Sequence, residues 1–162
     1  MKEIKLTRGK VAFVDDDDFE WLSQWKWFAS KSRNKWYAHT NYRKHDGTWG
    51  KLSMHSCVMN FPQQIFIDHA NGNGLDCQKH NLRAATRSQN GANRTSSLKS
   101  SSHYLGVSFY KRRLTNPWGA FIRKDKKLRY LGTFSTDVDA AKAYDTAAKE
   151  LHGEFANLNF KN

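Results

Sequence analysis

A carboxylate and an imidazole stand side by side at Asp68 and His69, directly after a short apolar run at residues 65–67. A loop rich in glycine and asparagine follows, and Asn90 comes after it. Glycine and asparagine tolerate positive φ angles, so we expect a sharp turn that brings the chain back along itself. A carboxylate, an amide and an imidazole directed at one point could bind a metal ion and activate a water molecule.

Two strands and a helix must position these side chains. The apolar run predicts the first strand, and residues 82–85 predict a second strand that returns beside it. Thr86 and Gln89 have the spacing of a capping box, which predicts a helix with Asn90 in its first turn. The three elements would then direct the three polar side chains to the same point.

The region before this unit predicts a strand, a helix and a hairpin. Residues 11–14 have the pattern of a short apolar strand, and aromatic residues recur at helical spacing over residues 19–28. A turn at Asp46-Gly47 follows the strand pattern of residues 36–42. The acidic run at residues 15–18 has two interpretations, a helix cap with solvated charge or a metal-binding cluster.

The pattern changes after a polar, serine-rich segment at residues 95–102, which is typical of a linker. Three β-rich runs follow, at residues 104–110, 118–123 and 128–134. Their spacing predicts an antiparallel meander. Residues 136–151 are rich in alanine and have apolar positions at helical spacing, with Gly153 as a suitable end. We expect this helix to cover one face of the sheet and to leave the other face open.

Positive charge is concentrated in the predicted sheet. The 162 residues include 27 Lys and Arg against 15 Asp and Glu, a formal net charge of +12. Eight basic residues and one acid lie between Lys111 and Arg129, together with aromatic residues such as Phe121. A basic sheet with interleaved aromatic side chains favours a nucleic-acid partner, and the alternative is an ordinary solvated face of lysine and arginine.

No apolar run approaches the ~20 residues that a membrane helix needs, and the N-terminus leads into no signal-peptide core. Two cysteines are too few for a disulfide framework, so we expect a cytoplasmic protein without a membrane partner. Cys57 and Cys77, together with His55 and His80, also raise the alternative of a zinc site, although their spacing is loose.

The polar region around Asp68 contains a recognisable series of motifs: Ile67-Asp68-His69, Asn71-Gly72-Asn73, Leu75-Asp76, Asn81-Leu82-Arg83, Thr86 and Gln89-Asn90. With these motifs, residues 67–94 resemble the HNH (ββα-metal) nucleases, in the asparagine-ending HNN subgroup of phage and intron homing endonucleases. The position after Asp76 is usually asparagine in that family and is Cys77 here.

This resemblance implies that Asp68 and Asn90 bind one divalent cation, Mg²⁺ or Mn²⁺, since hard oxygen ligands suit these ions. His69 would be the general base that takes a proton from the attacking water, with an ordinary pKa near ~6.5. Asn81 would be structural and would orient the His69 backbone. The products would carry a 3′-hydroxyl and a 5′-phosphate, and no small-molecule cofactor is implied.

A second series of motifs follows: Gly106-Val107, Trp118-x-Ala120-x-Ile122, Leu131-Gly132-Thr133-Phe134, Ala140-Ala141-x-Ala143-Tyr144-Asp145-x-Ala147-Ala148 and Asn157-Leu158-Asn159-Phe160. With them, residues 104–160 resemble the DNA-binding domain of plant ethylene-response (APETALA-type) factors. That resemblance implies a sheet that docks on double-stranded DNA, in the major groove. The expected DNA-binding residues are Arg123 and Tyr130, with Lys111, Arg112 and Arg129 nearby and Arg94 on the nuclease helix. Positions that carry arginine in the plant proteins are Ser108, Phe121 and Leu128 here, so no target sequence is implied.

We therefore expect an α+β protein, with an N-terminal α/β region leading into a ββα-metal motif, then a three-stranded antiparallel sheet packed on one helix. The expected domains are an HNH endonuclease domain at 1–94, a linker at 95–102 and a DNA-binding domain at 103–162.

The expected function is a site-specific, homing-type DNA endonuclease in a bacterial or phage-infected host cell. The alternatives are a non-cleaving transcriptional regulator with a relict nuclease fold and a structured-RNA binder. Target sequence, nicking versus double-strand cleavage, intron-encoded versus free-standing gene and oligomeric state (a monomer is compatible) stay open.

Overall fold

The computed structural model describes residues 1–32, 34–60, 65–93 and 101–160. The chain divides into two compact units, Met1–Thr86 and Arg87–Asn162. Both units combine small antiparallel sheets with helices, so the expected α+β class is confirmed. Within the described ranges, no helix is long and apolar enough to cross a membrane. Most of the predicted linker at 95–102 lies outside the described residues.

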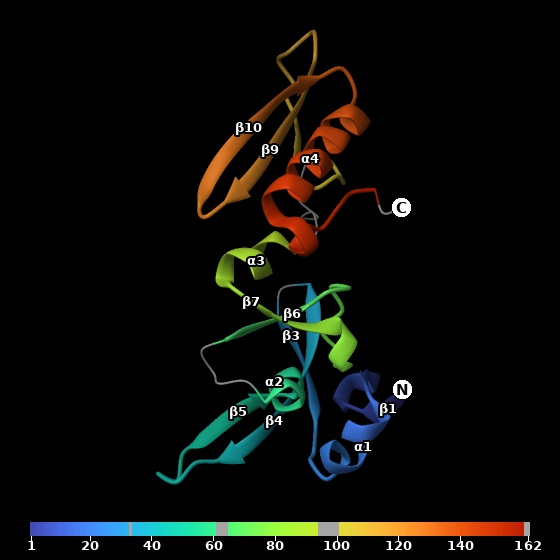
Figure 1. The fold of residues 1–162 in the computed structure, drawn as a ribbon, viewed down its shortest axis with the longest axis vertical. Coiled ribbons are helices and arrows are strands. Elements are labelled where there is room, and N and C mark those ends of the chain that lie inside the picture. Colours follow the sequence, from blue (N-terminus) through green and yellow to red (C-terminus); the bar gives the residue numbers. More distant parts are fainter. Residues whose placement is uncertain (33, 61–64, 94–100, 161–162) are drawn as a thin grey trace. The chain divides into compact units, whose positions relative to one another are not determined.

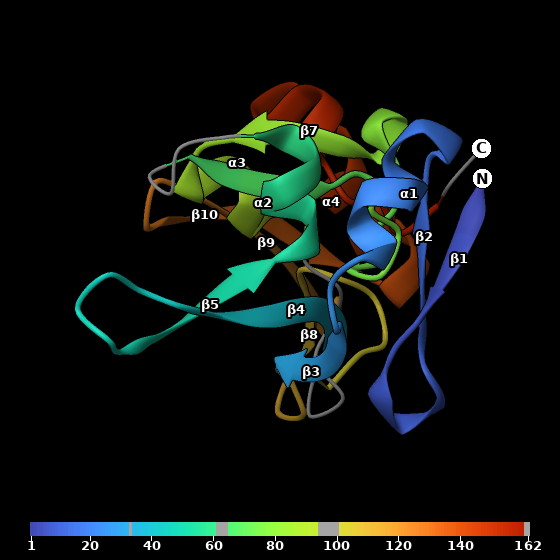
Figure 2. The same cartoon turned by 90° about the horizontal axis from the view of Figure 1, so that it is seen from below.

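The N-terminal unit contains three antiparallel strand systems. The first two are the ribbon β1 (Lys2–Lys5) and β2 (Val11–Val14), around η1 (Thr7–Gly9), and the meander β3 (Phe28–Ser32), β4 (Lys35–Arg43) and β5 (Trp49–Ser53). The third is the pair β6 (Phe66–His69) and β7 (Leu82–Ala85), preceded by η2 (Lys79–Asn81). Helix α1 (Asp16–Ser23) follows β2, and α2 (Met54–Met59) packs against β4 and β5 (Figure 2).

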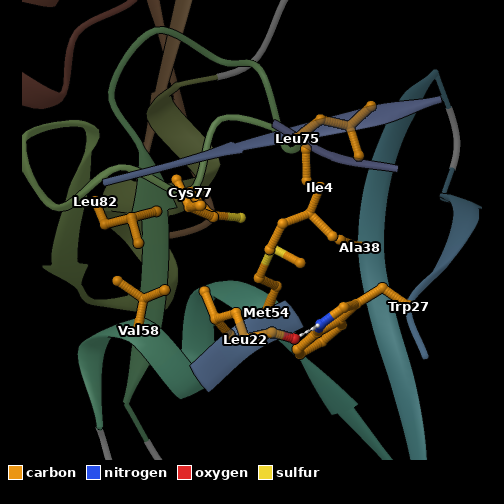
Figure 3. Close-up of a cluster of buried hydrophobic side chains, with 11 residues drawn as sticks. Ile4, Leu22, Trp27, Ala38, Met54, Val58, Leu75, Cys77 and Leu82 are labelled. Atoms are coloured by element: carbon orange, nitrogen blue, oxygen red, sulfur yellow. Dashed lines mark hydrogen bonds between the residues drawn. The ribbon is translucent and has the colours of Figure 1, made fainter. Parts of the chain in front are cut away.

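One apolar cluster joins these elements. Strands β1, β2, β4 and β7 and helices α1 and α2 contribute buried side chains, among them Ile4 from β1, Leu22 from α1, Ala38 from β4, Met54 from α2 and Leu82 from β7 (Figure 3). Leu22 and Met54 have no exposed surface, and burying a side chain of this size stabilises a fold by roughly 1.5–3 kcal/mol. The cluster therefore fixes β7, and with it the β6–β7 pair, against the rest of the unit.

The predicted helix over residues 19–28 was too long, because α1 ends at Ser23. The Trp27 indole N–H donates to the carbonyl oxygen of Leu22 at 2.7 Å, at the end of the helix, and Trp27 itself is buried. Trp25, expected on the buried helix face, is 47% exposed. Because the Leu22 carbonyl accepts a hydrogen bond from the buried indole, it does not require a donor from a further helical turn. The chain can therefore leave the helix and enter β3.

The C-terminal unit begins with α3 (Arg87–Ala92), which follows Thr86 as predicted. A sheet with the order β10-β9-β8 comes next, from the strands β8 (Val107–Phe109), β9 (Trp118–Lys124) and β10 (Lys127–Phe134). Helix α4 (Asp137–His152) lies along one face of this sheet (Figure 1), and η3 (Gly153–Phe155) follows it. Thr136 caps α4, since its hydroxyl accepts from the Asp139 N–H at 3.1 Å.

One buried acid holds the segment after α4, and Asn159 links that segment to the residues before β8. Asp145 on α4 accepts hydrogen bonds from the backbone N–H groups of Asn159 and Phe160 at 2.8 and 2.9 Å. The Asn159 side chain in turn accepts from the Leu105 N–H at 2.6 Å and donates to the Leu105 carbonyl at 3.1 Å. Asn159 thereby holds the segment before β8 against the segment after α4.

Candidate active site

The pairing of β6 with β7 places Asp68 and His69 at a buried edge. Asp68 lies opposite Arg83 and His69 lies opposite Leu82 in the antiparallel register. Both polar residues are buried, with 3% and 6% of their surface exposed. Buried polar groups of this kind are held by specific partners.

The Asp68 carboxylate is paired with Arg83. The Nε and Nη2 atoms of Arg83 donate to the Asp68 Oδ2 atom at 2.9 and 2.8 Å. The two side chains leave β6 and β7 from facing positions, so this ion pair forms as part of the strand pairing. The sequence predicted no role for Arg83 beyond its place in the Asn81-Leu82-Arg83 motif. Its pairing with Asp68 could not be predicted, because the pairing depends on strand register.

The loop between β6 and β7 is pinned by Asn81. Its side-chain oxygen accepts from the Asn71 N–H at 2.9 Å, and its Nδ2 donates to the Asp76 carbonyl at 2.8 Å. Its backbone carbonyl accepts from Ala70, next to His69, at 2.9 Å. Gly74 lies so close to β4 that a Cβ atom there would stand 2.5 Å from the Tyr37 ring, which requires glycine.

The same loop is fastened to β2 and to the acidic run. Phe13 exchanges backbone hydrogen bonds with Leu75 and Cys77 at 2.9 and 2.8 Å. The Asp15 carboxylate accepts from the Lys79 N–H at 2.7 Å and makes no side-chain cap to α1. Asp18 pairs with the Lys79 ammonium at 3.0 Å. The acidic run therefore anchors the loop through Lys79. This role differs from both interpretations of the sequence, a helix cap and a metal-binding cluster.

The His69 ring packs against two other rings. His55 of α2 and Tyr37 of β4 meet it edge to face, with ring centroids 5.0 and 5.9 Å away. Burial lowers the pKa of His69 to about 4, with a smaller contribution from Lys35. Burial also lowers the pKa of His55 to about 3, with contributions from His69 and His39. Both imidazoles are neutral at pH 7, so the ordinary pKa expected for His69 is wrong because of its burial.

Two residues near His69 were missed in the sequence. Tyr37 lies within the predicted strand 36–42, but its ring contact with His69 needs the β4 and β6 strands to be adjacent in space. Lys35 stands near His69 and close to Gly72, so it supplies a positive charge beside the loop. Neither contact has a local sequence signal.

Asn90, the second expected metal ligand, lies on α3 in the C-terminal unit, whereas Asp68 and His69 belong to the N-terminal unit. Asp68 and His69 are consecutive residues of β6, and the place of Asn90 at the site stays a prediction. Arg94 lies outside the described residues.

Among residues 1–32, 34–60, 65–93 and 101–160, no three or more His, Cys, Asp or Glu side chains form a group that could hold a metal ion. The zinc alternative at His55, Cys57, Cys77 and His80 is therefore unsupported. Burial raises the pKa of the Cys77 thiol to about 12, which opposes the thiolate form that zinc binds.

The C-terminal sheet has two unlike faces. Ala120 and Ile122 of β9 are buried on the face that α4 covers. Phe121 and Arg123 alternate with them and lie on the opposite face, which we call the outer face. Tyr130 pairs with Phe121 and shares the outer face.

The other expected DNA-binding residues lie elsewhere. Arg129 pairs with Ile122, so strand alternation places it on the α4 side. Lys111 and Arg112 are exposed in the loop between β8 and β9. A hollow of about 1050 Å³ opens within this unit, lined by residues of α3 and the sheet that include Tyr110, Phe121 and Arg123.

Comparisons with known proteins identify the family. The model of the HNH endonuclease family matches residues 60–92, which contain Asp68, His69, Asn81 and Asn90. An uncharacterized HNH endonuclease of Acanthamoeba polyphaga mimivirus is 30% identical over 159 residues, which cover 94% of this chain and 76% of the viral protein. This chain belongs to the HNH endonuclease family. Asp68 and His69 lie within the residues that the family model matches, and HNH nucleases generally use a divalent metal ion.

Plant transcription factors match a shorter part of the HNH chain. An AP2-like ethylene-responsive transcription factor of Arabidopsis thaliana and an APETALA2-like protein of Oryza sativa subsp. indica are each 47% identical over 60 residues. These matches cover 37% of this chain, but only 12% and 13% of the two plant proteins. The likeness is therefore limited to one domain-sized segment.

Proposed function

We propose that the chain is a site-specific DNA endonuclease of the homing type and of the HNN variant. The observation that carries this proposal is the burial of Asp68 and His69 at the end of β6, where the His69 imidazole is neutral and packs against the rings of Tyr37 and His55. A neutral His69 has a ring nitrogen that can accept a proton, which is the state a general base needs. Membership in the HNH family supports the same reaction class.

Asp68 and Asn90 would hold one Mg²⁺ or Mn²⁺ ion through their side-chain oxygens. When bound, the ion would stabilise the negative charge that develops on the phosphate and on the 3′ leaving oxygen. His69 takes the proton from the attacking water. Asn81 holds both ends of the loop that follows His69, and so fixes the His69 backbone.

Tyr37 and His55 limit the access of water to one side of His69 and restrict its ring to few orientations. A general base held in one orientation needs less reorganisation when substrate binds. Lys35, near the loop, is suited to attract the DNA phosphate.

Residues 103–162 form, in this proposal, an APETALA-type domain that binds double-stranded DNA and places the nuclease site. Its support is the basic sheet, whose outer face carries Arg123 and the exposed Leu128 and Tyr130, and the similarity to plant transcription factors. A small metal site has little surface for choosing a sequence, so a separate binding sheet explains how one target could be selected.

The test is a plasmid-cleavage assay with Mg²⁺, Mn²⁺ or EDTA on DNA from a candidate host locus. We expect His69→Ala to reduce cleavage at least about a hundredfold, the usual loss for a missing general base. Its DNA affinity should change less than about tenfold. His45→Ala, at an exposed histidine in the β4–β5 turn, is the matched control and should cleave normally. Metal-independent cleavage, or normal cleavage by His69→Ala, would exclude the proposed reaction.

A further inference from the structure

We propose that the outer face of the C-terminal sheet recognises thymine methyl groups in the DNA major groove, through Leu128 and Tyr130. The inference rests on the proposed DNA-binding role of residues 103–162. It adds the chemical class of the target, a duplex that presents thymines at the contacted base pairs.

The strand register places both side chains on the outer face. Leu128 pairs with Arg123, and Tyr130 pairs with Phe121, before the irregularity that precedes Gly132. Directly paired residues share a face, and Arg123 and Phe121 alternate with buried residues of β9. Leu128 and Tyr130 therefore project away from α4.

Both side chains are unusually open for their type. Leu128 is 59% exposed and Tyr130 is 55% exposed, although an apolar core lies on the other side of the same sheet. Phe121 packs against Tyr130, with ring centroids 5.4 Å apart, and Tyr110 meets Phe121 edge to face at 6.4 Å. Tyr130 thus rests on an aromatic row that holds its ring in place, and Leu128 lies two residues before it on the same strand face.

The charges of the unit indicate what covers this face. The segment from Asp137 to Glu154, which contains α4, has five acids and two lysines, whereas residues 111–129 have eight basic residues and one acid. A polyanion is therefore attracted to the sheet and its loops more than to the helix. By register, Lys124, Lys127 and Arg129 lie on the α4 side of the sheet, whereas Arg123 is the basic side chain that β9 presents on the outer face. The major groove is about 12 Å wide and admits a two-stranded β-ribbon, so the β9–β10 pair, with strands about 4.8 Å apart, is narrow enough to enter it.

Apolar side chains carry a specific meaning within such a groove. The 5-methyl group of thymine is the apolar feature of the major groove, and it is read by apolar contact, whereas guanine is read by arginine. Arg123 stands directly opposite Leu128 on the outer face, so a polar and an apolar reader lie side by side. This arrangement suits a mixed site in which thymines flank a guanine.

The experiment uses the full chain in EDTA, so that binding is measured without cleavage. A duplex is first selected from a random pool, and its thymines are then replaced one at a time by deoxyuridine, which lacks only the methyl group. We expect about a fourfold loss of affinity at each contacted thymine, the equivalent of one buried methyl-sized group. In Leu128→Ala, the penalty at one of these thymines should disappear. Leu114→Ala, at a leucine that is 102% exposed in the β8–β9 loop, is the matched control and should keep both penalties.

Each other result overturns the inference. Selected duplexes that bind equally well with deoxyuridine would show DNA binding without methyl recognition, and the proposed function would stand. Preference for single-stranded DNA would mean that the aromatic row stacks on unpaired bases. If no duplex is enriched, the DNA-binding role of residues 103–162 fails together with the inference. Circular dichroism of Leu128→Ala, at an exposed position, excludes unfolding as the cause of a lost penalty.

Discussion

The Asp68 carboxylate, which we propose as a metal ligand, already accepts hydrogen bonds from the guanidinium group of Arg83. Asp68 and Arg83 are brought together by strand pairing, and the Asp68 side chain is almost fully buried. Its charge is thus balanced within the fold before any ion arrives. Breaking a buried ion pair by removing one partner leaves an uncompensated charge, which is more costly than removing both.

We expect Arg83→Gln to lower the free energy of unfolding by about 3 kcal/mol, as measured by urea denaturation without metal. The double variant Asp68→Asn with Arg83→Gln should lose less than the sum of the two single changes, because neither charge remains. Arg83→Lys, which keeps the charge but cannot donate from two positions, should fall between wild type and Arg83→Gln. Additive losses would show that the two side chains do not stabilise each other.

Neutral histidines at the site make stability depend on pH. His55 is held neutral in the folded chain with a pKa of about 3, whereas an unfolded chain protonates it near ~6.5. Between these values the unfolded state binds more protons, so stability is complete above about pH 6.5 and is lost as the pH falls. Among the described residues, the buried Nδ1 atom of His55 has no hydrogen-bond partner.

His55→Phe should remove this dependence while keeping an aromatic ring against His69. We expect the wild-type unfolding free energy to fall faster than that of His55→Phe, by about 1.4 kcal/mol per pH unit between pH 6 and 4. The comparison uses urea denaturation at several pH values, so that carboxylates common to both chains cancel. Parallel curves would show that His55 is already charged in the folded state.

At the scale of elements, the β6–β7 loop depends on contacts far away in the sequence. Asp15, at the start of α1, accepts the Lys79 N–H at 2.7 Å across 64 residues. We expect Asp15→Ala to lower the free energy of unfolding by about 1.5–3 kcal/mol, the usual effect of a lost hydrogen bond to a charged group. Asp17→Ala, at an exposed acid of the same run, should cost about 0.5 kcal/mol through the helix dipole alone. Equal losses in thermal denaturation would mean that the run acts only as a helix start.

The local elements of this chain were predictable, and the contacts between them were not. Strands β6 and β7, the C-terminal meander and α4 follow from hydrophobic spacing and from turn and cap residues such as Thr136. The aromatic residues after Ser23 led to a predicted helix that was too long, because a periodic pattern cannot show the hydrogen bond of the Trp27 indole at the end of α1. The Asp68–Arg83 pair and the packing of His55 on His69 needed register and packing, which no local pattern encodes.

At the scale of the whole molecule, the net charge of +12 is unevenly placed. If the basic strands bind phosphates, affinity for duplex DNA should fall steeply with salt, since each neutralised phosphate releases bound cations. Lys111→Gln with Arg112→Gln should reduce the slope of log affinity against log salt by about two. Lys142→Gln with Lys149→Gln, at exposed lysines of α4, is the matched control and should leave the slope unchanged. If both double variants changed the slope equally in filter-binding titrations, the salt dependence would follow from net charge alone and not from the position of the charges.

The hydrogen bonds that Asp145 and Asn159 make also bear on whether residues 105–159 could be carried as an inserted domain. Asn159 touches Leu105, so the two ends of residues 105–159 lie next to each other. A domain whose ends meet can be inserted into a host chain without forcing distant points of that host apart. Residues 105–159 meet this condition.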